Sequence, residues 1–255
     1  MRRVMNGPQD QSGGSHGAVG VCALAEPGSL ATPTARASAP GRLAAETAVV
    51  ALGAIAVVRL LHVRDAADLQ WFLIPCVLVA AALAPTWIAR RDFPPIGLTR
   101  EHRGLALRTV LLPCLCILPA VCFVVWRLAL SGAPIPLQPV LAEGQNLSTW
   151  LLYQFLYVAT AEEVFFRGYV QANAMRWLGE RRLSPQARQR IAILISAACF
   201  ALAHVAVQGQ IVSALTFLPG LLLAWLFVRT RSLLAPILFH GLANVSYGIM
   251  AATFA

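Results

Sequence analysis

Apolar residues fall into long blocks along the chain, and short arginine-bearing segments separate these blocks. A helix needs about 20 mainly apolar residues to cross the hydrocarbon core of a bilayer. The pattern therefore predicts an all-α fold, a polytopic transmembrane helical bundle with one span for each block. The fourth block is too long for one straight crossing, so we expect it to tilt, to break or to continue into the cytoplasm. The seven predicted spans are 43–61, 69–89, 109–130, 148–175, 191–207, 211–228 and 233–253.

The first 41 residues have a different pattern, because Gly, Ala, Ser and Pro dominate and no apolar periodicity is visible. Such a composition buries too little apolar surface to fold, so residues 1–41 are predicted to be a disordered N-terminal tail. The tail lacks the continuous apolar core of about 7–15 residues that a signal peptide needs. An overextended start site is an alternative origin for it. Residues 42–255 form the predicted integral membrane domain.

The overall composition supports a membrane protein. The chain is 58% hydrophobic and only 12% charged, whereas soluble domains average about 45–50% and 25%. The net charge of +9 comes from arginine, since the chain contains no lysine. A nucleic-acid-binding role is not indicated, because no basic face is combined with aromatic stacking residues.

Arginine placement predicts the orientation. Arginines cluster between the second and third spans, between the fourth and fifth, and between the sixth and seventh, whereas the connections 131–147 and 208–210 contain none. Positively charged loops remain in the cytoplasm, so we expect a cytoplasmic N-terminus and an external C-terminus. Abundant alanine and arginine without lysine indicate a GC-rich bacterium, which makes a bacterial inner (plasma) membrane the expected location.

Three predicted spans carry polar groups at membrane depth. Charged groups are expensive there, at about 2.5–3.5 kcal/mol each on insertion scales, and usually mark functional sites. Counted from the arginines of the cytoplasmic loops, Glu163 lies 13 residues from Arg176, His204 lies 14 residues from Arg190, and His240 lies 9 residues from Arg231. At about 1.5 Å per residue these depths are roughly 20, 21 and 14 Å. Three helices thus bring polar groups to a similar level, which predicts one shared site in a buried cavity among the four C-terminal spans.

The spacing of the carboxylates separates their roles. Glu163 and Arg167 are four residues apart and share one helix face, so we expect an ion pair. Glu162 is turned about 100° away from that pair. An unpaired carboxylate in a poorly hydrated pocket suits general-base chemistry, and His204 could share a water molecule with it.

The remaining residues suggest an oxyanion site. His240 and Asn244 are also four residues apart, so both side chains can point at one spot and donate hydrogen bonds to a developing oxyanion. Phe200 lies one turn before His204 and could hold that imidazole in place. The set provides a base, an activated water and an oxyanion clamp, which are the parts needed for peptide hydrolysis. A His-Glu-x-x-His helix, a Gly-x-Ser-x-Gly stretch and paired membrane aspartates are absent from the sequence.

At these residues the chain resembles the CAAX protease and bacteriocin-processing family of intramembrane proteases, which includes the Ras-converting CAAX endopeptidase. The motif Glu-Glu-x-x-x-Arg is matched by residues 162–167, Phe-x-x-x-His by residues 200–204 and His-x-x-x-Asn by residues 240–244. The three motifs occur in order within a core of residues 148–254. The N-terminal half matches only as generic membrane helices.

The resemblance implies a glutamate-type endopeptidase that acts on a membrane-anchored protein or peptide in the lipid bilayer. Glu162 and His204 would activate water, and His240 and Asn244 would stabilise the oxyanion. Prenylated C-termini, peptide leaders and sorting anchors are the implied substrates, and a bacterial origin favours the last two. No cofactor is expected, but zinc held by Glu162, His204 and His240 is a minority alternative.

Two further hypotheses remain open at this stage. One is a non-catalytic membrane scaffold or immunity protein on the same fold, and the intact motif set argues against it. The other is a proton-coupled transporter, which the concentration of all polar groups in one half of the chain disfavours. The oligomeric state is unknown from sequence.

Overall fold

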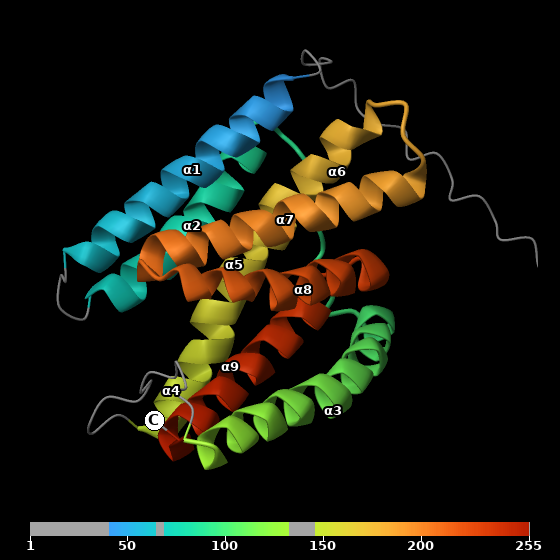
Figure 1. Ribbon diagram of the computed structural model, residues 1–255. Coiled ribbons are helices and arrows are strands. Elements are labelled where there is room, and N and C mark those ends of the chain that lie inside the picture. Colours follow the sequence, from blue (N-terminus) through green and yellow to red (C-terminus); the bar gives the residue numbers. More distant parts are fainter. Residues whose placement is uncertain (1–40, 65–68, 133–145, 255) are drawn as a thin grey trace, which may run out of the picture. The chain divides into compact units, whose positions relative to one another are not determined.

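The computed structural model describes residues 41–64, 69–132 and 146–254, and all regular structure in these ranges is helical (Figure 1). This confirms the predicted all-α fold. Apart from Gly41, the predicted tail 1–41 lies outside the described residues. The elements are α1 (Arg42–Val63), α2 (Leu69–Ile88), α3 (Arg100–Leu130), α4 (Leu147–Leu152), η1 (Tyr153–Ala159), α5 (Thr160–Glu163), η2 (Val164–Gln171), α6 (Ala172–Gly179), α7 (Pro185–Gln208), η3 (Ile211–Thr216), α8 (Phe217–Thr230) and α9 (Leu234–Phe254).

Several of these helices have the length and composition of membrane spans. Within the described ranges, five helical stretches qualify, namely α1, α3, α7, the joined η3 and α8, and α9. The apolar part of α2, Phe72–Ile88, is shorter. The chain is therefore an integral membrane protein with a polytopic helical bundle, whereas the exact number of seven spans stays a prediction.

The long fourth block folds as one helical run, residues 147–179, that departs from α-helical hydrogen bonding in two stretches. Two π-helical stretches, η1 and η2, lie on either side of the four-residue α5. The Thr160 hydroxyl donates to the carbonyl of Phe155, five residues back, at 2.7 Å. π-Helical turns are rare and usually occur at functional sites inside α-helices. The sequence-based expectation of a tilted or broken span thus corresponds to a continuous run with altered winding.

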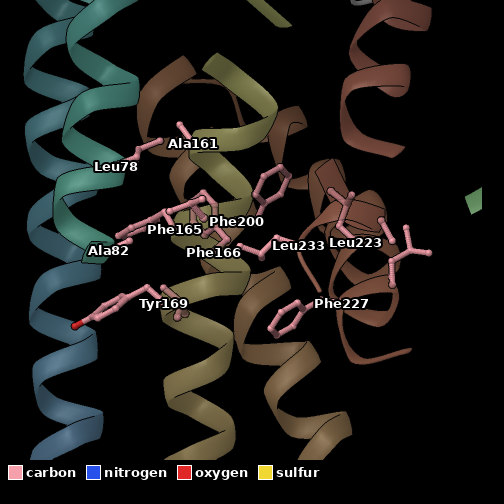
Figure 2. Packing of buried hydrophobic residues seen from close by; sticks show 14 of the residues in the cluster. Leu78, Ala82, Ala161, Phe165, Phe166, Tyr169, Phe200, Leu223, Phe227 and Leu233 are labelled. Carbon is pink, nitrogen blue, oxygen red and sulfur yellow. The ribbon is translucent and has the colours of Figure 1, made fainter. Parts of the chain in front are cut away.

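This run is the packing centre of the described residues. It contacts α1, α2, α7, α8 and α9, and Figure 1 shows its yellow ribbon passing among them. Every residue of η2 is buried. Figure 2 shows Phe165 pointing from the run toward Leu78 and Ala82 of α2, and Tyr169 pointing toward α1. Burial of these two large aromatic side chains, which extend to the same side of the run, fixes its rotation and hence the direction of the carboxylates on α5.

Local sequence signals set the ends of α7, the helix that carries His204. The Ser184 hydroxyl accepts from the Ala187 backbone N–H at 3.2 Å, and Pro185 occupies the first turn. Both features are typical of a helix N-terminus. The helix ends at Gly209, whose φ of 69° is the left-handed conformation that favours glycine. Arg59 of α1 donates to the Val207 carbonyl at 2.8 Å and so ties this end of α7 to α1.

The segment between α2 and α3 packs against the bundle. The backbone N–H of Leu233 donates to the Pro95 carbonyl at 3.1 Å. Gly97 has a φ of 90°, and a Cβ there would lie 2.5 Å from Ser232 Cβ. Arg91 makes two 2.7 Å hydrogen bonds to the Glu46 carboxylate, which raise the pKa of Arg91. The segment therefore joins α1 to the α8–α9 turn.

Candidate active site

The predicted ion pair between Glu163 and Arg167 is present and completely buried. Arg167 Nη1 donates to Glu163 Oε1 at 2.8 Å, and both side chains have 0% exposure. Arg167 Nη2 also donates to the Gly220 carbonyl of α8 at 3.1 Å. The guanidinium carbon lies 4.7 Å from the centre of the Phe200 ring. A buried charge pair needs such additional partners, because its desolvation opposes the attraction between the two charges.

His240 lies between the two carboxylates. Its Nδ1 is 2.8 Å from Glu163 Oε1, and its Nε2 is 3.7 Å from Glu162 Oε2. A carboxylate only accepts, so Nδ1–H donates to Glu163. The structure thus places His240 in the carboxylate cluster, although the sequence pointed only to Asn244 as its partner.

Glu162 and His204 line the same cavity. Glu162 is 20% exposed, and its buried Oε2 has no hydrogen-bond partner. His204 Nδ1 donates to the Phe200 carbonyl at 2.9 Å, because a carbonyl oxygen can only accept. This bond leaves Nε2 available to a water molecule or substrate. The Phe200 and His204 rings lie 4.4 Å apart, centre to centre, so Phe200 packs on the imidazole as expected.

The cavity has a volume of about 210 Å³ and is mainly apolar. We expected it among the four C-terminal helices, but α1 and α2 form much of its wall. The reason is that α1 and α2 pack against η2 and α7 and so close the space beside Glu162. The lining residues are Ile55, Val58, Ile74, Pro75, Leu78, Tyr153, Val158, Ala161, Glu162, Phe166, Ala203, His204, Val207 and Gln208.

Asn244 has a partner that sequence reasoning gave no weight. Its Nδ2 donates to Gln154 Oε1 at 3.0 Å, and Gln154 is buried on η1. Gln154 stands beside Tyr153 and near Tyr157, so its surroundings resemble an interfacial belt. The one available signal was a carboxamide, Gln154, near the start of the fourth apolar block.

The described residues contain no group of three or more His, Cys, Asp or Glu side chains arranged to hold a metal ion. Zinc ligation by Glu162, His204 and His240 therefore stays a hypothesis for chelation experiments. The arrangement itself offers three elements for chemistry: a carboxylate and an imidazole that face one cavity, and a buried ion pair that holds a second imidazole behind them. These are the elements of general-base activation of water.

Comparison with known protein families agrees with this geometry. Residues 144–246 match the family model described as Type II CAAX prenyl endopeptidase Rce1-like. The match includes all three motifs and confirms the resemblance to the CAAX protease family inferred from them. No curated protein and no solved structure matches the chain significantly.

Proposed function

We propose that this chain is a CAAX-type intramembrane endopeptidase, as the Rce1-like match of residues 144–246 supports, and that it uses Glu162 and His204 to activate water. The observation that carries this proposal is that both side chains line one cavity, and that Oε2 of Glu162 has no hydrogen-bond partner. Glu163 and Arg167 hold the neighbouring charges in place and do not contact the substrate.

The proposed reaction begins with a water molecule held between the Glu162 carboxylate and His204 Nε2. Glu162 takes a proton from this water while the oxygen attacks the scissile carbonyl carbon. The C=O electron pair moves onto the carbonyl oxygen, and His240 Nε2–H and Asn244 Nδ2–H donate to that oxyanion. When the tetrahedral intermediate collapses, the C–N bond breaks and Glu162 returns its proton to the leaving amine.

Donation by Nε2 of His240 needs a proton on both nitrogens, since Nδ1–H is bound to Glu163. In the structure, Nε2 faces the Glu162 carboxylate, 3.7 Å from Oε2. Asn244 would have to exchange its bond to Gln154 for one to the oxyanion. Glu163 and Gln154 are therefore proposed to position the two oxyanion donors.

The proposed substrate is a membrane-anchored protein or peptide whose tail or transmembrane segment enters the bundle. Peptide maturation and protein sorting are the preferred roles, in a bacterial inner membrane, with the N-terminus in the cytoplasm. The apolar wall of the cavity supports a substrate with apolar side chains near the scissile bond.

The test compares purified wild type with Glu162→Gln and His204→Ala on a panel of membrane-anchored peptides in liposomes. Glu101→Gln and His62→Ala serve as matched controls, because both side chains lie away from the cavity. Cleavage that both site variants lose, that both controls keep and that a strong chelator leaves unchanged supports the glutamate-type mechanism. Cleavage that the chelator abolishes and zinc restores would assign the same residues to metal binding. The scaffold hypothesis would be favoured if wild type cleaves no peptide of the panel and if the site variants replace wild type in cells that need this protein.

A further inference from the structure

A second cavity of about 180 Å³ lies between α1, α7 and the η2–α6 part of the helical run 147–179, which is called the central run below. Small side chains form most of its wall, so it has room for an apolar group. It contains none of the residues assigned above to catalysis. Its lining residues are Ala44, Thr47, Ala48, Ala51, Val170, Asn173, Ala174, Trp177, Ile195 and Cys199.

The two cavities are neighbours along the same three helices. On each helix, a residue that lines one cavity is followed four positions away by a residue that lines the other. Four residues correspond to about one helical turn, or roughly 6 Å. The cavities are therefore successive compartments of one crevice between α1, the central run and α7. The three pairs are Ile55 and Ala51, Phe166 and Val170, and Ala203 and Cys199.

Two residues that line the second cavity each carry a buried hydrogen-bond donor without a partner. Asn173 is 1% exposed; its Oδ1 accepts from Arg176 at 3.0 Å, while its Nδ2 has no hydrogen-bond partner. The indole Nε1–H of Trp177 is also buried without a partner. The two residues are four apart and share one helix face. Buried donors are nearly always paired in proteins, so these two indicate an acceptor that enters the cavity.

We propose that the second cavity binds the substrate peptide away from the scissile bond, with Asn173 and Trp177 donating to its carbonyl or carboxylate oxygens. This inference rests on the proposed function. Residues 162 and 173 are 11 positions apart, which corresponds to roughly 16 Å along a helix. An extended peptide advances about 3.3 Å per residue. The acceptor therefore lies about five residues from the scissile bond, toward the end of the bundle that carries Arg176.

Cys199 offers a direct probe of occupancy, because its thiol lines the second cavity. We would label it with N-ethylmaleimide in liposomes of fixed phospholipid composition, in an inactive Glu162→Gln chain whose other five cysteines are replaced by alanine. The probes are the panel peptides described above and versions truncated to two residues on either side of the cleaved bond. We expect the full-length peptides to slow labelling at least fivefold and the truncated ones to leave it unchanged.

Several results would overturn the proposal. If peptides that wild type cleaves leave Cys199 labelling unchanged, the second cavity is not on the substrate path, while the proposed function stands. Labelling that varies with phospholipid composition, and not with peptide, would assign the cavity to lipid. Peptides that are neither cleaved nor protective would refute the proposed function and this inference together.

The donors are tested by kinetics. Trp177→Phe removes Nε1–H but keeps an aromatic ring, and Trp225→Phe on the exposed side of α8 is its matched control. We expect Trp177→Phe to raise KM for full-length peptides about fivefold to tenfold relative to truncated peptides, with little change in kcat. Asn173→Asp keeps the oxygen that accepts from Arg176 and replaces the unpartnered donor by an acceptor. The ratio of KM for full-length peptides to KM for truncated peptides should therefore rise further than in Trp177→Phe. Equal effects on long and short peptides would indicate a structural role and contradict the proposal.

Discussion

The helix α3 and the central run from α4 to α6 are two hydrophobic parts of the chain that differ in how much of their surface is buried inside the protein. α3 has 31 residues and high mean hydropathy, yet only 6% of its most apolar window is buried inside the protein. In η2, by contrast, every residue is buried. A lipid-facing helix needs only a hydrophobic surface, whereas an internal helix must match its neighbours on all sides. Hydropathy therefore detects α3 easily and says little about the helix that carries the chemistry.

The same two regions also differ in where their ionisable residues lie along the helix. α3 keeps its acidic and basic side chains near its ends, where Glu101 lies in the first turn and Arg127 in the last. The central run places Glu163 and Arg167 in its middle, with full burial and mutual hydrogen bonds. Charges near helix ends can reach the water, but charges in the middle need partners. The comparison predicts that substitutions in the central run lower activity and stability far more than substitutions in α3 do.

The largest difference should appear in catalysis. We expect Glu162→Gln and His204→Ala each to lower kcat/KM by about 10²–10⁴-fold, because each removes one part of a water-activating pair. Residues that act as a unit are not additive, so the double variant should lose little more than the worse single variant. α3 begins with its own carboxylate–imidazole pair, and the double variant Glu101→Gln, His102→Ala should keep wild-type kcat/KM. Fully additive losses at the cavity would contradict the shared role.

The second largest difference should appear in stability. Arg167→Met leaves the buried Glu163 carboxylate without its cation, so we expect the free energy of unfolding to fall by about 3–5 kcal/mol. Arg108→Met, on the exposed surface of α3, should change it by less than about 0.5 kcal/mol. Reversible unfolding in mixed micelles measures both. Equal values for the two variants would mean that the buried ion pair does not stabilise the fold.

Glycine substitutions test close packing between helices, and their expected effects on stability are of intermediate size. A Cβ at Gly241 of α9 would lie 2.4 Å from the Phe155 ring of η1, whereas a Cβ at Gly104 of α3 meets nothing within 4 Å. We expect Gly241→Ala to destabilise by about 1–3 kcal/mol through overpacking. Gly104→Ala should stabilise by up to about 1 kcal/mol, because alanine favours the helix. Thermal unfolding in micelles compares the two, and a stabilising Gly241→Ala would show that η1 and α9 are less closely packed than described.

The smallest effect is expected on the lipid side of α3. Leu112 is 68% exposed, so Leu112→Ala should change the free energy of unfolding by less than about 0.5 kcal/mol and leave cleavage unchanged. The matched variant is Leu223→Ala, whose side chain is only 2% exposed and should give a loss of about 2–5 kcal/mol. A large loss for Leu112→Ala would reveal a protein partner on this face of α3.

Much of the fold and part of the site could be predicted from the sequence. The apolar blocks correspond to helices because span length follows from bilayer thickness. The Glu163–Arg167 pair followed from four-residue spacing, and the shared level of Glu163 and His240 followed from counting residues inward from arginine. Both rules depend on helix geometry alone, which is why they need no tertiary information.

The remaining features depend on packing between helices. Nothing in residues 153–171 signals π-helical winding, and both π-helical stretches pack against distant helices, η1 against α9 and η2 against α2 and α7. The walls that α1 and α2 give to the catalytic cavity consist of ordinary apolar residues such as Ile55 and Leu78. The bond from Asn244 to Gln154 joins residues 90 positions apart. Such contacts are decided by the three-dimensional arrangement and leave no local pattern.

The two π-helical stretches also affect how this chain can tolerate insertions and deletions. A π turn contains more residues than an α turn, so η2 resembles an α-helix that has accommodated an extra residue. Deletion of one residue within η2 would turn Asn173 and Trp177 by about 100° relative to Glu162. Every side chain type would be retained, yet the two cavities would no longer face the same crevice. The length of this segment is thus as much a determinant of the site as the identities of its residues.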